Sequence, residues 1–181
     1  MTRTIWTPIT RRALRFLIVA LTGSMLQGCR RTPRNEGAQA PPADSGFAAM
    51  QARGEGVMGV NQYESAHVFE DLPDGGRIVL ERDDPSDAIA ITAIRQHMRD
   101  IAGAFQRGDF AKPFHVHAQT VPGTRAMSAG HAAITYEERD RPRGAEVRIR
   151  AADPLTVASV HEFLAFQRGA HHAAGHEGTM E

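Results

Sequence analysis

The sequence is poor in cysteine and lysine, and each shortage excludes a class of protein. One cysteine among 181 residues cannot form an internal disulfide, nor a zinc site that needs two or more cysteine ligands. Lys112 is the only lysine, and the 21 basic residues are matched by 21 acidic ones. Because clustered Lys and Arg drive nucleic-acid binding through counterion release, we expect no nucleic-acid partner.

Basic residues followed by an apolar run predict a signal peptide over residues 1–28. Arg11, Arg12 and Arg15 precede an uncharged stretch, residues 16–26, which has about the length of the apolar region of a signal peptide. This stretch is too short to cross a membrane comfortably. The signal peptide takes four Arg and no acid, which leaves the rest of the chain mildly acidic.

The apolar run ends in Leu26-Gln27-Gly28-Cys29, which resembles the lipobox of bacterial lipoproteins. Gln27 departs from the small residue that is usual there. The resemblance implies cleavage before Cys29, lipidation of its thiol and a membrane anchor made of several acyl chains. Since Arg30 follows the cysteine, where Asp typically favours the inner membrane, the resemblance implies an outer-membrane lipoprotein that faces the periplasm. The alternative is a plain secretory signal whose end happens to hold the one cysteine.

Composition divides the remaining chain into a tether, a domain and a tail. Residues 29–62 contain three Pro and five Gly without a periodic apolar pattern, which predicts a disordered tether. Residues 63–170 are expected to form one globular domain. Residues 171–181 hold three His and two Gly, which predicts a frayed tail that binds metal ions opportunistically.

Within the predicted domain, a pattern of two strands and a helix occurs twice. Two hairpins are expected, with strands over residues 63–70, 77–82, 132–138 and 146–150. Asp84-Pro85 opens a helix that reaches about residue 107, and Asp153-Pro154 opens another that reaches about residue 168. In both, the carboxylate would cap free N–H groups, and proline suits the first helical position. Internal duplication or convergence on good cap and hairpin chemistry explains the repeat.

Side-chain periodicity predicts the fold class. The first helix carries apolar residues at spacings of three and four, which form one stripe: Ile91, Ile94, Met98, Ile101 and Phe105. Apolar residues alternate along the strands, so each strand buries one face. We expect an α+β fold, an antiparallel sheet of about four strands with two helices on one face, and a possible ββα-ββα internal duplication.

Histidine and methionine residues suggest a metal site. If residues 112–127 are extended, alternation places His115 and His117 on one face. Met127 would add a thioether, and thioether with imidazole selects copper over magnesium or calcium. The predicted site is built from His117 and Met127 with His97, which borders the apolar stripe of the first helix. His115 or His161, the latter on the apolar stripe of the second helix, completes it. The alternative is that these histidines bond carbonyl groups and that Met127 fills a gap in the core.

No residue pattern predicts catalysis. Ser128 and Ser159 lie in no nucleophile elbow, the only thiol is assigned to lipid, and phosphate-binding Gly-rich loops are absent. We therefore expect no enzyme and carry two hypotheses. One is a periplasm-facing lipoprotein that binds a soft transition metal, copper, without turnover. The other is a non-catalytic interaction or structural module for an envelope protein, in which the histidines are incidental.

Four features together resemble a widespread family of small bacterial proteins of unestablished activity, over about residues 63–172. They are the hairpin, Gly108-Asp109-Phe110, the stretch from His117 to Met127 through Val121-Pro122-Gly123, and the ending from His161 to Gln167. Some members are labelled as aspartate carbamoyltransferases. This chain lacks the Ser-Thr-Arg-Thr phosphate loop of those enzymes and is much shorter, so we exclude that activity. The resemblance implies no site residues, and the copper hypothesis rests on residue chemistry.

Overall fold

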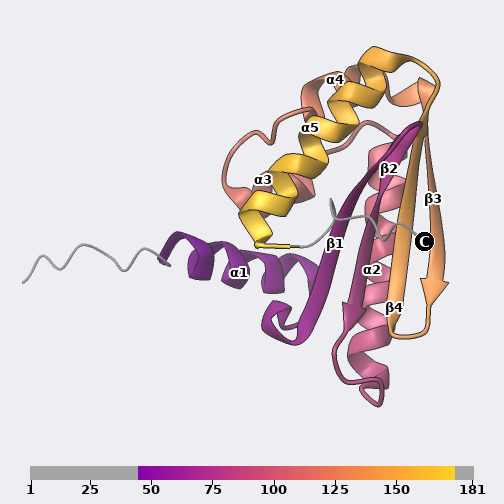
Figure 1. Cartoon of the computed structure of the whole chain (residues 1–181). Helices are drawn as coiled ribbons and strands as arrows, with labels where there is room; N and C mark the ends of the chain where they lie inside the picture. Colours follow the sequence, from indigo (N-terminus) through magenta and orange to yellow (C-terminus); the bar gives the residue numbers. More distant parts are fainter. Residues whose placement is uncertain (1–44, 174–181) are drawn as a thin grey trace, which may run out of the picture. The chain divides into compact units, whose positions relative to one another are not determined.

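The computed structural model describes residues 45–173, which form an antiparallel sheet covered by helices (Figure 1). The four strands of this part are β1 (Ser65–Leu72), β2 (Gly75–Arg82), β3 (Ile134–Arg141) and β4 (Gly144–Ala151). Their order is β1-β2-β4-β3, and each neighbouring pair is antiparallel. The α+β prediction is confirmed.

Two long helices cover one face of the sheet. The helices of the described part are α1 (Ser45–Met58), α2 (Ala88–Gln106), α3 (Ala111–His117), α4 (Thr124–Ala129) and α5 (Pro154–His171). Short 3-10 turns span Gln62–Glu64 and His131–Ala133. Helix α2 packs on β2, β3 and β4, and α5 packs on β1, β2 and β4. Each long helix therefore lies mainly over the hairpin that the other half of the domain supplies.

An offset of 69 residues relates the two halves of the domain. Adding 69 to the residue numbers of β1 gives those of β3, and adding it to those of β2 gives those of β4. The same addition takes Asp84-Pro85 to Asp153-Pro154. In the central ladder Ile78 pairs with Val147, which is its own counterpart under this offset. A local two-fold axis therefore passes through that pair, and the predicted ββα-ββα repeat is a geometric property of the fold.

The helix caps follow the predicted chemistry at one helix and depart from it at the other. Asp153 accepts a hydrogen bond from the Thr156 N–H at 2.8 Å, and Pro154 is the first residue of α5. Helix α2 begins later than expected, because Asp87 is its N-cap and accepts from the Ala90 N–H at 3.0 Å. Asp84 instead closes a turn by accepting from the Ser86 N–H at 2.8 Å.

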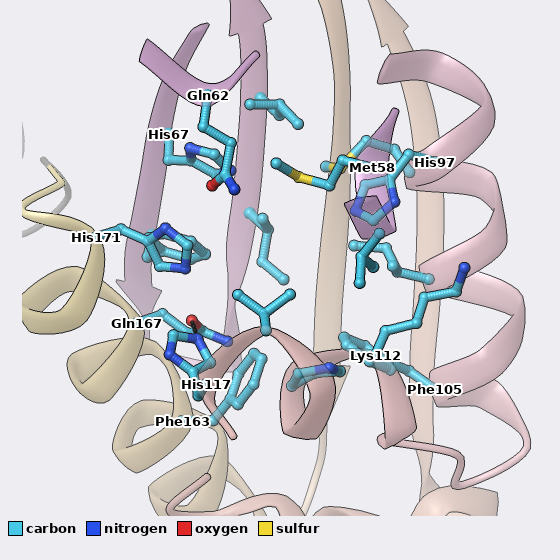
Figure 2. Close-up of a pocket in the computed structure, with 18 residues that line it drawn as sticks. Met58, Gln62, His67, His97, Phe105, Lys112, His117, Phe163, Gln167 and His171 are labelled. Atoms are coloured by element: carbon cyan, nitrogen blue, oxygen red, sulfur yellow. Dashed lines mark hydrogen bonds between the residues drawn. The ribbon is translucent and has the colours of Figure 1, made fainter. Parts of the chain in front are cut away.

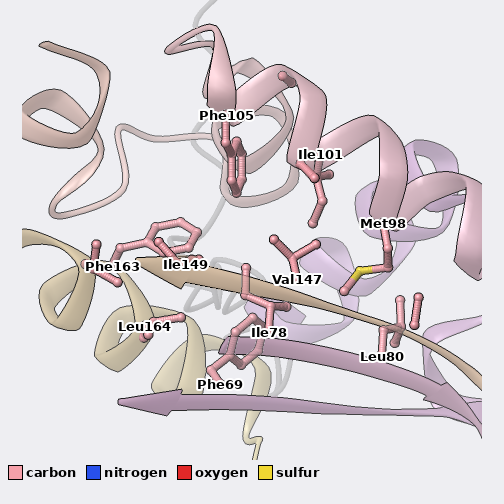
Figure 3. Close-up of a cluster of buried hydrophobic side chains, with 14 of the residues drawn as sticks. Phe69, Ile78, Leu80, Met98, Ile101, Phe105, Val147, Ile149, Phe163 and Leu164 are labelled. Carbon is pink, nitrogen blue, oxygen red and sulfur yellow. The ribbon is translucent and has the colours of Figure 1, made fainter. Parts of the chain in front are cut away.

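The core lies between the sheet and the two long helices (Figure 3). All five residues of the predicted α2 stripe are buried. They meet inward residues of the central strands and of α5, among them Ile78, Leu80, Val147, Phe163 and Leu164. Each such side chain contributes roughly 1.5–3 kcal/mol by leaving water, so this layer is the main source of stability.

The ends of the domain differ from the prediction. Residues 45–58 form helix α1, which packs against α3, so the predicted tether is wrong for this part. Gly54 allows the helix to pack closely, because a Cβ there would lie 1.5 Å from the Gln62 amide. Helix α5 continues to His171, which is therefore not part of a frayed tail. The predicted signal peptide, Cys29 and His176 lie outside the described residues.

Candidate functional site

A pocket opens where α1 ends, bounded by α2, α3, α5 and the β1-β2 hairpin (Figure 2). Its free volume is about 70 Å³, which exceeds the roughly 10–15 Å³ that one water requires. Aliphatic and aromatic side chains form most of its wall, including Phe69, Ile101, Phe105 and Phe163. The pocket is thus a mostly apolar space with room for an ion or a few water molecules.

Four histidines from four different elements line this pocket. His67 comes from β1, His97 from α2, His117 from the end of α3 and His171 from the end of α5. Alternation explains His67, which lies on the same face of β1 as the buried Phe69. Because the four residues are far apart in the sequence, only the tertiary fold brings their imidazoles to one space.

Burial keeps the imidazoles of His67 and His97 uncharged. It lowers the pKa of His67 from 6.5 to about 4, with a smaller lowering from His97. It also lowers the pKa of His97 to about 4, where the charge of Lys112 adds to the lowering and Asp100 opposes it. Both rings are therefore neutral at pH 7, and neutral imidazole is the form that binds metal ions.

The other two histidines are held in the same state. Burial lowers the pKa of His171 to about 3, and the neighbouring His67, His117 and His172 lower it further. Burial also lowers the pKa of His117, although its hydrogen bond to Gln167 opposes that shift. The pocket thus presents neutral nitrogen donors over the whole physiological range of pH.

A hydrogen bond between two buried side chains orients His117. Its Nε2–H donates to the amide oxygen of Gln167 at 2.7 Å. The two side chains are 9% and 5% exposed, so solvent does not compete for this bond. Since Nε2 carries the proton, the lone pair of the ring lies on Nδ1. Carbonyl oxygens hold metal-binding histidines in this way in many proteins.

Several polar atoms at the pocket have no hydrogen-bond partner among the described residues. They include Nδ1 of His97, Nδ1 of His171 and the amide oxygen of Gln62, whose nitrogen donates to the Gln51 carbonyl at 2.9 Å. Buried polar atoms are normally paired, and leaving one unpaired costs about 1–3 kcal/mol. These atoms are consistent with a bound ligand or ordered solvent.

Two methionine side chains also line the pocket. Met58 is the last residue of α1 and Met98 lies on α2, and both are buried. Met58 lies beside His97 on the α2 side of the pocket, whereas His67, His117 and His171 lie toward α5 and β1 (Figure 2). One end of the pocket therefore holds Met58 and His97, which Met98 follows along α2, and is called the thioether end. The other end, the imidazole end, holds the other three histidines.

The structure brings together only two of the five residues predicted to bind metal. His97 and His117 both line the pocket. His115 is exposed, because residues 111–117 form helix α3 and residues two apart on a helix point to nearly opposite sides. The expectation that residues 112–127 are extended is wrong, since α3 and α4 both fall within this segment.

Met127 and His161 have structural positions outside the pocket. Met127 is fully buried in the core. His161 reaches the first hairpin, where its Nε2 lies 3.0 Å from the Leu72 carbonyl oxygen and 2.9 Å from that of Gly75. Since both partners are acceptors, Nε2 carries a proton and cannot bind a metal ion while it holds the hairpin.

The Val121-Pro122-Gly123 motif has a packing role. Gly123 has φ = 77°, and a Cβ there would lie 2.1 Å from the Ser159 carbonyl oxygen of α5. Only glycine allows α4 to begin this close to α5. The motif therefore sets the path of the chain after His117.

Sequence reasoning missed His67, Met58 and Gln62, and it assigned His171 to the tail. Period-two alternation with Phe69 could have identified His67 as an inward residue. Met58 and Gln62 gave no signal, because they lie in the segment predicted to be a tether. Among residues 45–173, no three or more His, Cys, Asp or Glu side chains are set to hold a metal ion as they stand.

Comparisons with protein-family models, with curated proteins and with solved structures found no match for this chain. The resemblance in the sequence to a family of small bacterial proteins therefore stays a prediction. None of the helices within residues 45–173 is both long enough and apolar enough to span a membrane.

Proposed function

We propose that this protein is a lipid-anchored, periplasm-facing protein that binds copper as Cu(I) in the pocket, without catalytic turnover. One observation carries the proposal: neutral imidazoles and two thioethers line a single apolar pocket. Thioether and imidazole are the soft and borderline donors that favour Cu(I) over hard ions such as Mg²⁺ or Ca²⁺. Apolar walls would also shield the ion from solvent.

The thioether end supplies the proposed ligands, Met58, Met98 and His97. Nδ1 of His97 is buried and has no partner in the described part of the chain, so it is free to bind an ion. Met58 and Met98 are 9% and 1% exposed, so little solvent reaches their sulfur atoms. This set keeps the predicted chemistry of imidazole with thioether and retains His97, but it replaces His115, His117, Met127 and His161.

The charge near the thioether end favours an ion of low charge. Lys112 lowers the pKa of His97, which means that its ammonium group disfavours additional positive charge on that imidazole. A monovalent ion is repelled less than a divalent one at the same distance. The charge of Lys112 therefore disfavours a divalent ion at this end of the pocket more than it disfavours Cu(I).

A competition titration tests the copper site. The full chain carrying Cys29→Ser would be titrated anaerobically with Cu(I) against a chelator of known affinity. We expect Met58→Leu and Met98→Leu each to weaken Cu(I) binding by tenfold or more, since each removes a sulfur ligand at nearly constant volume. Met127→Leu is the matched control, a buried methionine outside the pocket, and should change the affinity by less than twofold.

The low pKa of His97 also predicts how Cu(I) binding in this titration depends on pH. A free imidazole would lose Cu(I) below about pH 6 because its reference pKa is about 6.5. With a pKa of about 4 for His97, binding should persist to about pH 5. If the Met58→Leu/Met98→Leu double variant binds Cu(I) as tightly as its parent, the copper proposal is wrong. The interaction module with incidental histidines then becomes the better hypothesis.

The anchor is proposed from the Leu26-Gln27-Gly28-Cys29 segment, which lies outside the described residues. Lipidation of Cys29 would attach the domain to the outer membrane through acyl chains. In cell fractionation we expect the parent protein in the membrane pellet and the Cys29→Ser variant elsewhere, with a mature mass lower by the lipid. A Cys29→Ser variant that stays in the pellet with unchanged mass would contradict the anchor but not the copper site.

A further inference from the structure

A groove distinct from the pocket lies between α1 and the last turns of α5, beside the end of α3 (Figure 1). Its free volume is about 580 Å³, whereas the pocket has about 70 Å³. Clefts that bind small molecules usually measure roughly 300–1,000 Å³. The groove therefore has room for a small organic molecule.

Two pairs of aromatic rings line the groove. Phe47 of α1 is stacked on His172, with nearly parallel rings whose centroids are 4.4 Å apart. Phe166 of α5 meets His117 edge-on at 5.0 Å. The buried Met50 adds a flexible apolar side chain to the same lining. Aromatic rings and thioethers pack well against another aromatic ring, so this lining favours a flat, apolar molecule.

Arg53 brings a permanent positive charge to the groove, and no acidic residue of the described part lines it. Its Nε–H donates to the Val116 carbonyl oxygen at 2.8 Å, which fixes the side chain at the end of α3. The two terminal nitrogens of the guanidinium group remain available, and such a pair matches the two oxygens of a carboxylate. The lining therefore favours an anion over a cation.

The charge of Arg53 also acts on the His117 side of the groove. Burial is the main cause of the lowered pKa of His117, and Arg53 lowers it further. No acidic side chain is among the groups that shift this pKa. A carboxylate beside Arg53 would therefore supply the negative charge that the surrounding residues do not.

Gly169 of α5 leaves part of the groove open. A Cβ at this position would meet no heavy atom within 4 Å, so packing does not require glycine here. Glycine is also among the residues least favourable to a helix. A larger side chain at position 169 would therefore be tolerated by the fold and would fill space in the groove.

We propose that the groove is a binding site for an aromatic carboxylate. The ring of the ligand would pack against the two aromatic pairs, and its carboxylate would bind Arg53. Because Arg53 is exposed, the carboxylate would keep contact with solvent while the ring is buried. The inference goes beyond the proposed function and needs no copper, although His117 lines both the groove and the pocket.

Calorimetric titration with 2-naphthylacetate tests the charge requirement, with the neutral 2-naphthylacetamide as the comparison ligand. The protein is the full chain with Cys29→Ser. We expect the carboxylate to bind at least about fivefold more tightly than the amide. Arg53→Gln should reduce this ratio below about twofold and leave the affinity for the amide unchanged. Arg125→Gln, which replaces an exposed arginine outside the groove, is the matched control and should preserve the ratio.

Filling the groove tests the position of the site independently of charge. Gly169→Leu should weaken binding of both ligands by about tenfold or more, because its side chain occupies space that the ring requires. Gly103→Leu is the matched control, a helical glycine of α2 outside the groove, where a Cβ would meet an Arg107 side-chain nitrogen at 3.5 Å. It should leave both affinities within about twofold. Circular dichroism of each variant checks that the fold is intact.

Three results would overturn the proposal. The first is a parent that binds the carboxylate no more tightly than the amide, or binds neither ligand. The second is a ratio that Arg53→Gln leaves unchanged, and the third is binding that Gly169→Leu leaves intact. The copper proposal is tested separately, because Met58 and Met98 line the pocket and not the groove.

Discussion

The two halves of the domain share one backbone plan but use their edge strands differently. His67 of β1 and Tyr136 of β3 correspond under the 69-residue offset, and both face the helices. Tyr136 packs edge-on against Phe105 at 5.7 Å, so the β3 side is filled by aromatic rings. The smaller His67 ring borders the pocket instead. The pocket therefore borders the edge strand that carries the smaller ring at this position.

The hairpins are held in equivalent ways by different residues. His161 of α5 contacts the carbonyl oxygens of Leu72 and Gly75 in the first hairpin. Arg95 of α2 donates to the carbonyls of Arg141 and Gly144, which are their counterparts in the second hairpin. Holding the turn of the first hairpin therefore explains the position of His161. Because Arg95 does the same in the second hairpin, His161 is better assigned to the structure than to a metal site.

An ion pair between an arginine on a long helix and an aspartate on an edge strand also occurs in both halves, but the two pairs differ in solvent exposure. Arg168 of α5 binds Asp71 through two bonds of 2.9 Å and also donates to the Phe69 carbonyl at 2.8 Å. Its counterpart Arg99 lies 3.5 Å from Asp140. The Arg168 and Asp71 side chains are 16% and 21% exposed, against 44% and 56% for the second pair. The first pair should therefore contribute far more to stability.

Removing each arginine tests this difference and gives the largest effect that we expect. Arg168→Ala should lower the free energy of unfolding by about 2–3 kcal/mol, because Asp71 and a carbonyl lose charged donors in a partly buried site. Arg99→Ala should change it by less than about 1 kcal/mol, as exposed pairs usually do. Urea denaturation of both variants measures the two values. Equal losses would show that the repeat is energetically symmetric.

The fold could be predicted because its signals are local. The α2 stripe, the two hairpin turns and the Asp-Pro pairs each act within a few residues, and together they define two ββα units. Helix α3 was missed because His115 and His117 alternate as they would in a strand. Pro113, which can occupy the first turn of a helix, was the contrary signal.

The site could not be predicted from such signals. His67 and His171 lie near opposite ends of the domain's sequence. Their rings come together in space only because α5 packs on the β1-β2 hairpin. Helix α1 was missed because it carries no continuous apolar stripe; its buried residues include Gly54 and Gln51 as well as methionines. The thioether of Met58 was therefore assigned to a tether. Residue chemistry predicted the kind of ligand, and long-range packing decided which residues supply it.

The smallest predicted effect concerns pH and the pair His67 and Tyr136. In the unfolded chain His67 protonates with a pKa near 6.5, whereas burial lowers it to about 4 in the folded protein. Between these values the unfolded state binds more protons, so stability is full above about pH 6.5 and falls as the pH drops toward 4. Burial raises the pKa of Tyr136 above its usual value, so this side chain does not titrate in that range.

Replacing His67 with Phe should make the two halves alike at this position, because neither edge strand then carries a side chain there that titrates between pH 4 and pH 6.5. Between pH 7 and pH 5 the parent should lose about 1–2 kcal/mol more stability than His67→Phe does, because one depressed imidazole has been removed. His97 and His171 remain in both proteins, so the variant keeps part of the acid sensitivity. Comparing each protein with itself at the two pH values cancels any packing change at position 67. If both proteins lose the same stability, His67 is not held neutral by burial, and the difference between the edge strands is one of shape alone.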